Sequence, residues 1–212
     1  VRVIPHGAFD YLTRPPEEKP LPPELEGAEG PVVLCFGLLR PYKGIEQLLQ
    51  AYGQVTGDGG PDAELWIVGN PRMDVAPLRE LAARAGGRVR TVTRFVDDAE
   101  IPAIFRRADL VALPYLDAEE SGVLHTALAF GKPLVLSAVG GFPEVAETGA
   151  ARLVPPGDTD ALATALADLT EDENARAEMA AAATRAAAGP YSWDETARRT
   201  LDLYRELLET RP

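Results

Sequence analysis

The feature that most constrains the fold of this sequence is a regular alternation of short apolar runs with segments of helical periodicity. Short runs that are apolar throughout and bounded by Gly, Pro or Asp are typical of strands buried on both faces. Repeated alternation of such strands with helices predicts a parallel sheet with right-handed crossovers and helices on both sides. We therefore expect an α/β, Rossmann-like doubly wound sheet, with strands at 32–37, 64–69, 89–95, 110–114, 133–137 and 151–155.

The two ends of the chain depart from this alternation. VRVIPHG (1–7) predicts a short strand and a turn, whereas the Pro- and Glu-rich residues 14–31 predict a surface connection. We expect three parts: a strand entering from another domain plus this connection (1–30), the Rossmann-like domain (31–190) and a C-terminal helix (191–212). Because the sequence starts without Met inside a strand-like segment, we expect it to be one domain of a longer protein.

Composition excludes several classes of protein. The sequence has 21 Lys and Arg against 33 Asp and Glu, a net charge of −12, which argues against binding a nucleic-acid polymer. A single cysteine, Cys35, rules out an intramolecular disulfide and is compatible with a reducing cytosol. No apolar run approaches membrane-spanning length and no signal peptide opens the sequence, so we expect a cytoplasmic location.

The loops that follow strands are the candidate binding sites, because ligands of open parallel sheets lie at the carboxyl ends of the strands. The first such loop runs from Gly37 to Gly44 and carries two cations, Arg40 and Lys43. Free N–H groups at the following helix start would suit a diphosphate. On these residues alone, a solvated loop with two surface cations is an equally good interpretation.

The fourth loop, in residues 115–133, is richer in polar groups. Glu119 and Glu120 precede Ser121 and Gly122, and a helix is predicted from there. Ser121 is a good N-cap, and Gly122 exposes backbone N–H groups to an anion. The two glutamates either complement the helix dipole or accept hydrogen bonds from sugar hydroxyls.

Two further loops leave their alternatives open. Gly140-Gly141, before a helix start, fits either close approach to a ligand or tight packing. Asp97-Asp98 lacks the spacing of a metal site, and we expect one of the two to be an N-cap. His6 and His125 form no ligand set with the single cysteine, so each is predicted to be an ordinary core or surface histidine.

Taken in order, these segments resemble the C-terminal half of a GT-B glycosyltransferase of the retaining group 1 type. The resemblance covers nearly the whole chain, and the combination is specific although each piece alone is weak. The matching stretches are VIPHG, FGLLRPYKG, LWIVG, the run from RFVDDAEIP to GGFPEV, and ARLVPPGDTDALATAL.

The resemblance implies that this half binds a nucleotide-diphosphate sugar, whereas a missing N-terminal half binds the acceptor. Arg40 and Lys43 would then grip the diphosphate beside Gly37. With no aspartate pair placed for a metal, these cations and the helix N-termini would stabilise the leaving group, so transfer would need no metal and no cofactor.

The resemblance also assigns the remaining contacts. Val96 would meet the base, largely through backbone, while Ser121, Gly122 and Val123 would touch ribose and phosphate. The acid before them would touch the sugar, which makes Glu119 and Glu120 candidate catalytic residues.

One position departs from the family pattern. The family has two glutamates separated by seven residues, the second of which binds the ribose hydroxyls from the helix. Thr126 occupies the aligned helix position here, and the spacing back from it falls on Ala118. Asp117, Glu119 and Glu120 are the nearby acids, so a one-residue shift in the loop is expected. A threonine can hydrogen-bond but lacks the bidentate grip of a carboxylate.

The activity that follows from the resemblance is that of a metal-independent, retaining hexosyltransferase. The isolated domain is expected to be inactive without the absent half, through which any peripheral membrane contact would also be made. Two other classes stay open. One is a non-catalytic nucleotide- or carbohydrate-binding domain, favoured by Thr126, and the other is a sugar-nucleotide epimerase of the same fold.

Overall fold

The computed structural model describes residues 2–56, 62–85 and 88–209, which contain one parallel six-stranded sheet. Its strand order is β3-β2-β1-β4-β5-β6, so the chain builds outward in one direction and then in the other. This confirms the predicted doubly wound sheet, with every strand within a few residues of its expected place. The strands are β1 (Val32–Phe36), β2 (Glu64–Val68), β3 (Arg88–Val92), β4 (Leu110–Leu113), β5 (Leu134–Ser137) and β6 (Ala151–Val154).

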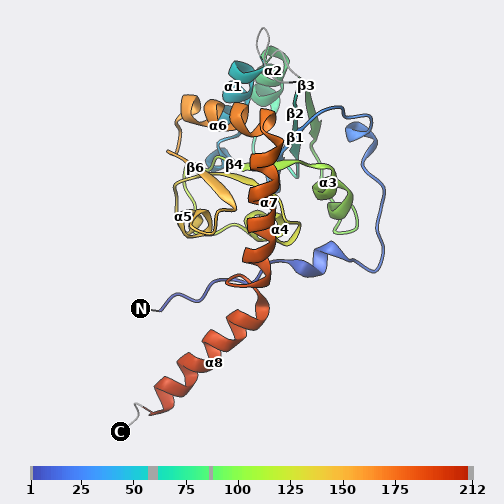
Figure 1. Cartoon of the computed structure of the whole chain (residues 1–212). Coiled ribbons are helices and arrows are strands. Elements are labelled where there is room, and N and C mark those ends of the chain that lie inside the picture. The colour runs from blue at the N-terminus through green and yellow to red at the C-terminus, as the bar shows by residue number, and fades with distance from the viewer. Residues whose placement is uncertain (1, 57–61, 86–87, 210–212) are drawn as a thin grey trace.

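Helices cover both faces of the sheet (Figure 1). Side chains of alternate strand residues point to opposite faces, so Val33 and Cys35 pack in one core, whereas Val32 and Leu34 pack in the other. The first core is covered by α1 (Ile45–Val55), α2 (Ala76–Arg84) and α6 (Thr159–Glu171). The second core is covered by α3 (Ile101–Arg107), α4 (Gly122–Ala129), α5 (Phe142–Ala146) and most of α7 (Glu173–Ala188).

Two local expectations were wrong. Residues 2–9 form no strand, because this segment runs beside α4 and α7 and has no sheet edge to pair with; Val1 lies outside the described residues. Neither Asp97 nor Asp98 caps α3 with its side chain. Instead, the Glu100 carboxylate accepts the Asp97 N–H at 3.0 Å and pairs with Arg94.

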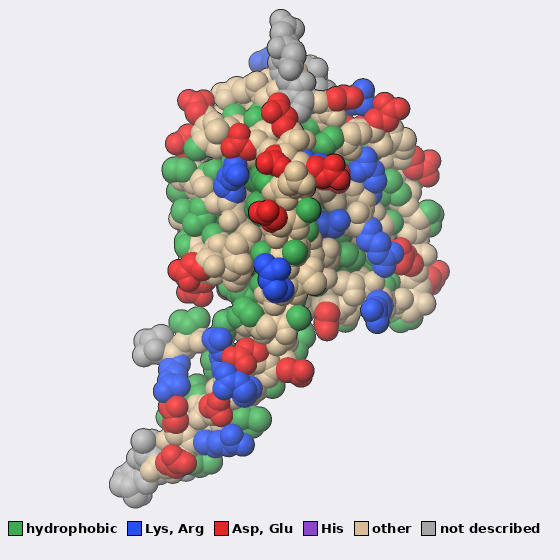
Figure 2. Space-filling model, in the orientation of Figure 1, with side chains coloured by type: hydrophobic (Ala, Val, Ile, Leu, Met, Phe, Trp, Pro, Cys, Tyr) green, Lys and Arg blue, Asp and Glu red, His purple; other side chains and the backbone are tan. Residues whose placement is uncertain are grey.

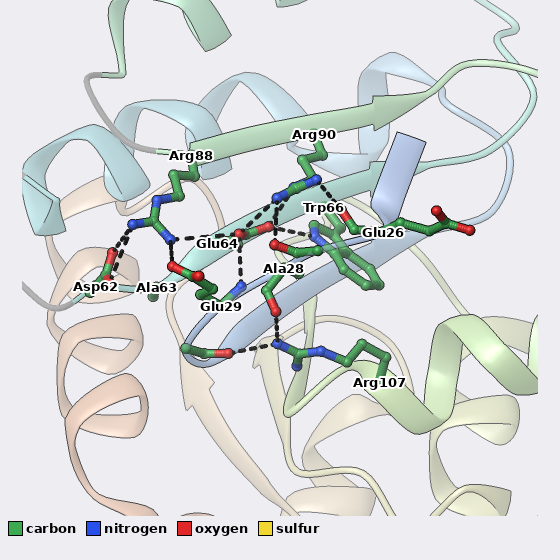
Figure 3. A network of polar contacts seen from close by, with 12 residues as sticks. Glu26, Ala28, Glu29, Asp62, Ala63, Glu64, Trp66, Arg88, Arg90 and Arg107 are labelled. Atoms are coloured by element: carbon green, nitrogen blue, oxygen red, sulfur yellow. Dashed lines mark hydrogen bonds and ion pairs between the residues drawn. The ribbon is translucent and has the colours of Figure 1, made fainter. Parts of the chain in front are cut away.

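The Pro-rich connection, which contains the short 3-10 helix η2 (Pro23–Leu25), is fixed to the amino-terminal edge of the sheet by a polar network (Figure 3). Glu64 lies at its centre, fully buried, and accepts hydrogen bonds from Arg90, the Trp66 indole and the Glu29 amide. Arg90 and Arg107 in turn donate to backbone carbonyls of residues 26–30. The network lies at the opposite end of the strands from the loops predicted to bind ligand.

Two helix ends carry common capping residues. Gly131, at φ 61°, ends α4 with its N–H on Leu128 O, and the Lys132 N–H bonds Ala127 O. Ser192 caps α8 (Trp193–Glu209) by accepting the Glu195 N–H at 3.2 Å. The Glu195 carboxylate does not return to Ser192 but pairs with the arginines that follow it in α8.

Helix α8 projects from the rest of the molecule (Figure 1), and none of its residues is buried. Figure 2 shows hydrophobic side chains exposed beside charged ones along it. The exposed apolar side chains include those of Trp193, Leu201, Tyr204 and Leu208. Residues 210–212 of the predicted C-terminal helix lie outside the described residues.

Candidate functional site

The sheet reverses its direction of growth between β1 and β4, and their loops form the candidate site. At such a switch point the two following helices diverge to opposite sides and leave a crevice at the strand ends. The β1 loop contains the 3-10 helix η3 (Pro41–Lys43), and it is tied to the β4 loop by a bond from the Leu116 N–H to Tyr42 O at 2.7 Å. Gly44, at φ 65°, approaches Pro114 O so closely that a Cβ would lie 1.9 Å from it.

Gly37 lies at the base of this crevice. Its φ is 103°, and a Cβ built on it would be 3.0 Å from Val123 Cγ2 and 3.1 Å from Lys43 Nζ. The lysine from one loop and the start of α4 from the other therefore meet directly over Gly37. The structure brings together three of the residues that the sequence singled out.

Lys43 is the most unusual residue of the site, because its side chain is only 5% exposed. The Nζ atom lies 4.9 Å from the Tyr115 ring centroid and donates one long hydrogen bond, 3.4 Å, to Phe36 O. Within the described residues it forms no ion pair. Burial lowers the pKa of Lys43, and the nearby charge of Arg40 acts in the same direction. A buried ammonium without a carboxylate is an incomplete arrangement that an anion would complete.

Arg40 is exposed and lies at the rim of the site. It lines a small hollow with Ile45, Met73 and Leu116, which places it on the outer side of the β1 loop. Like Lys43, it has no carboxylate partner among the residues that the structure describes. The two cations thus belong to one loop, with Lys43 buried beneath it and Arg40 exposed at its rim.

The first turn of α4 faces the crevice with its amide groups. Ser121 occupies the N-cap position, as predicted, but its hydroxyl does not cap the helix. It lies 3.2 Å from the Tyr115 hydroxyl instead. For the amides of Gly122 and Val123, the described part of the chain supplies no acceptor. These N–H groups and Lys43 would converge on one anion.

In the acidic loop before α4, hydrogen bonds hold the carboxylate of one of the three acids, Glu120. The Glu120 carboxylate contacts His125 Nε2 at 2.9 Å through Oε2, which also accepts the Ser121 N–H at 3.3 Å. Asp117 and Glu119 are exposed and make no side-chain hydrogen bond to any described residue. Only Glu120 has a fixed carboxylate at the helix start.

Gly140 and Gly141, in the loop after β5, lie against the acidic loop. Gly140 has φ 48°, and a Cβ there would lie 2.2 Å from Ala118 O. The Gly141 N–H donates to Glu119 O at 3.1 Å. The two glycines therefore let the β5 loop pack closely against the acidic loop, as the packing interpretation predicted.

Val96 and Thr126, the remaining predicted contact residues, are both buried. Val96 packs its side chain into the core, so only its backbone could meet a ligand. Thr126 is buried, and its hydroxyl donates to Gly122 O at 2.9 Å within α4. Its proton is therefore committed to its own helix, and only its lone pairs could serve a ligand.

Sequence reasoning missed the importance of His125 and Tyr115. His125 is 3% exposed and lies one helical turn after Ser121, a spacing that points its ring back toward the preceding loop. Tyr115 ends the strand run directly before the loop and lies under Lys43. A histidine in the first turn of a site-bearing helix, five residues after an acid, was the available signal.

No group of three or more His, Cys, Asp or Glu side chains in residues 2–56, 62–85 and 88–209 is arranged to hold a metal ion. No described helix combines the length and the apolar character needed to cross a bilayer.

Comparison with solved structures places the fold in a class. The chain superimposes on sucrose-phosphate synthase from Thermosynechococcus elongatus with a TM-score of 0.74 and 24% identity, covering 99% of this chain and 53% of that one. For Anabaena HepE in complex with UDP-glucose the TM-score is 0.71 at 26% identity, with 84% and 50% covered. The fold is that of one half of a GT-B glycosyltransferase.

Sequence comparison gives the family. The family model for glycosyl transferases group 1 matches residues 30–172, and the chain belongs to this family. It is 36% identical over 187 residues to a phosphatidyl-myo-inositol mannosyltransferase of Mycolicibacterium smegmatis, which covers 86% of this chain and 47% of the relative. It is 31% identical to an alpha-D-kanosaminyltransferase of Streptomyces kanamyceticus, with 84% and 46% covered. The chain thus spans about half the length of the curated relatives it matches.

Proposed function

We propose that this chain is the donor-binding half of a glycosyltransferase that moves a sugar from a nucleotide diphosphate to an acceptor. The observation that carries the proposal is Lys43, a buried ammonium without a carboxylate partner in the described structure, at the switch point of the sheet. The diphosphate would lie between Lys43, the first amides of α4 and Arg40. Relatives whose names include GDP-mannose, and a similar structure in complex with UDP-glucose, support this class of ligand.

The same groups would assist the chemistry. Sugar transfer leaves negative charge on the departing diphosphate, and fixed cations and amide dipoles stabilise such charge without reorganisation. Lys43 and the α4 amides would do this from the floor of the crevice, with Arg40 closing over the outer phosphate. We therefore propose transfer without a metal ion, and with retention of anomeric configuration as the family resemblance implies.

The acceptor would be bound by the part of the protein that lies outside this sequence. Relatives are about twice as long as this chain, and the exposed apolar side chains of α8 provide a surface on which the remaining half would pack. We propose that the acceptor-binding half packs against α8 and that the complete protein acts in the cytoplasm. Amide hydrogen exchange in α8 should slow when the rest of the protein is present.

Titration of the chain with UDP, GDP and ADP tests the binding proposal. Lys43→Ala and Arg40→Ala should each weaken binding of the preferred nucleotide, by about 1.5–3 kcal/mol for the loss of a charged hydrogen bond. Wild-type affinity in both variants would refute the diphosphate assignment. For the complete protein, a strict requirement for added Mg²⁺ or Mn²⁺ would refute metal independence, and an inverted product anomer would refute retention.

A second candidate is a nucleotide- or carbohydrate-binding domain without transferase activity. The observation in its favour is Thr126, whose hydroxyl donates to Gly122 O where the family has a glutamate. Detectable transfer or hydrolysis of a sugar nucleotide by the complete protein would exclude it.

A further inference from the structure

His125 lies at the meeting point of three segments that are distant in sequence. It belongs to the first turn of α4, and its ring packs against His6 and Phe9 of the N-terminal segment, with centroids 4.9 Å and 6.0 Å away. On another side it packs against Tyr191, at the turn between α7 and α8, at 6.0 Å. This enclosure leaves the ring 3% exposed and fixes its orientation.

The contacts of the ring determine its protonation state. A carboxylate only accepts, so the 2.9 Å contact with Glu120 requires His125 Nε2 to carry a hydrogen and donate it. Nδ1 is buried and has no hydrogen-bond partner among the described residues. Protonating Nδ1 would bury a donor without an acceptor, and burial lowers the pKa of His125. The imidazole is therefore a neutral donor aimed at one carboxylate oxygen.

Glu120 is held by this donor and still open to a ligand. Its side chain is 62% exposed although Oε2 is bound to His125 and to the Ser121 amide. The other oxygen, Oε1, lies over Gly141, where a built Cβ would come within 3.2 Å of it. A side chain at position 141 would therefore crowd the space that Oε1 occupies. One oxygen is anchored in the protein and the other stays available.

We propose that His125 is a positioning residue, which fixes the Glu120 carboxylate at the start of α4 so that Oε1 accepts hydrogen bonds from the donor sugar. The inference rests on the proposed function, because it assumes that a nucleotide-diphosphate sugar occupies the crevice. It assigns the sugar contact to Glu120 rather than to Asp117 or Glu119, whose carboxylates nothing in the described structure holds in place.

Affinities of the 212-residue chain for a nucleoside diphosphate and for the matching nucleotide sugar, UDP with UDP-glucose and GDP with GDP-mannose, test this role. His125→Leu should keep the diphosphate affinity within about twofold and lose about tenfold for the nucleotide sugar, the effect of one charged hydrogen bond. Glu120→Gln should show the same split, and the double variant should lose no more than either single one. His125→Gln, whose amide can still donate, should restore part of the loss.

Controls separate positioning from packing. His6→Phe changes the ring beside His125 without touching Glu120 and should leave both affinities unchanged. Because Glu120 is exposed, Glu120→Gln is informative even if His125→Leu lowers stability. In the wild type, side-chain nitrogen shifts should show His125 as the neutral tautomer protonated at Nε2.

The outcomes separate the positioning role of His125 from the proposed function. Diphosphate binding with an undiminished nucleotide-sugar affinity in both Glu120→Gln and His125→Leu would overturn the positioning role alone, as would additive losses in the double variant. No binding of either nucleotide by the wild type would overturn the proposed function and this inference with it.

Discussion

Replacing Lys43 by Met should make the ligand-free chain more stable while destroying its nucleotide site. Methionine keeps an unbranched stem of similar length but removes the charge, so the fold no longer has to bury an ammonium. In the native chain that ammonium is compensated by the Tyr115 ring at 4.9 Å and one 3.4 Å hydrogen bond to Phe36 O. A cation over an aromatic ring contributes about 0.5–2 kcal/mol, less than the several kcal/mol needed to desolvate an ion.

The expected gain is about 1–2 kcal/mol, which for a domain of this size corresponds to a rise in Tm of about 2–8 °C. The same substitution should lower the affinity for a nucleoside diphosphate about tenfold or more, because a charged hydrogen bond is lost. Thermal unfolding followed by circular dichroism measures the first quantity, and calorimetric titration the second.

Lys132→Met is the matched control. Lys132 is partly buried and its pKa, like that of Lys43, is lowered by burial, but its Nζ donates to Arg106 O and it precedes β5, at the opposite end of the strands from the candidate site. Its replacement should leave nucleotide affinity unchanged. A Lys43→Met chain less stable than wild type would show that the ammonium is satisfied within the fold. Unchanged affinity would show that it does not meet phosphate. Either result refutes the reasoning.

Three further expectations follow from the same structure. Because burial lowers the pKa of Lys43, nucleotide affinity should fall as pH rises from neutral through that pKa. A Lys43→Met chain titrated alongside should lack this fall, and an equal fall in both chains would contradict the prediction. Gly140→Ala should lower Tm by several degrees more than Gly149→Ala. Both glycines have positive φ, but a Cβ at position 140 would lie 2.2 Å from Ala118 O, whereas a Cβ at position 149 would lie 3.6 Å from its nearest neighbour. Glu64→Gln should reduce the loss of stability in acid. Burial by itself would raise the pKa of Glu64, but hydrogen bonds, that from Arg90 foremost, lower this pKa overall. The stability that the Glu64 carboxylate contributes is therefore present above its unfolded-state pKa and is lost as pH falls through its folded-state pKa. Denaturant unfolding at pH 3–7 measures this, and parallel curves for both chains would disagree with it.

The strands and most helices could be predicted from the sequence because their signals are local. Apolar runs such as VVLCF and helical spacing such as Ile45, Leu48, Leu49 and Tyr52 follow from one chain segment burying one surface. The end of α4 was equally local, since only glycine readily adopts the φ of 61° found at Gly131. The absent strand at residues 2–7 shows the limit of such signals, because a strand needs a partner that only the tertiary structure can supply.

The candidate site could be predicted from the sequence, but its geometry could not. The loops that follow strands are the expected ligand-binding loops of such a sheet, and Lys43, Arg40, Ser121 and Gly122 were singled out for this reason. The sequence could not show that Lys43 is buried and Arg40 exposed, since both are cations in one loop.

The sequence by itself thus determined the alternation of six strands with helices, the end of the strands at which the candidate site lies, and the family resemblance. Only the tertiary structure decided which acid is held, because two adjacent glutamates point in different directions from the loop and the His125 ring contacts only Glu120. It also decided that Gly140 supports the acidic loop by packing. Burial and direction depend on segments far apart along the chain, and for this reason neither can be deduced from local patterns.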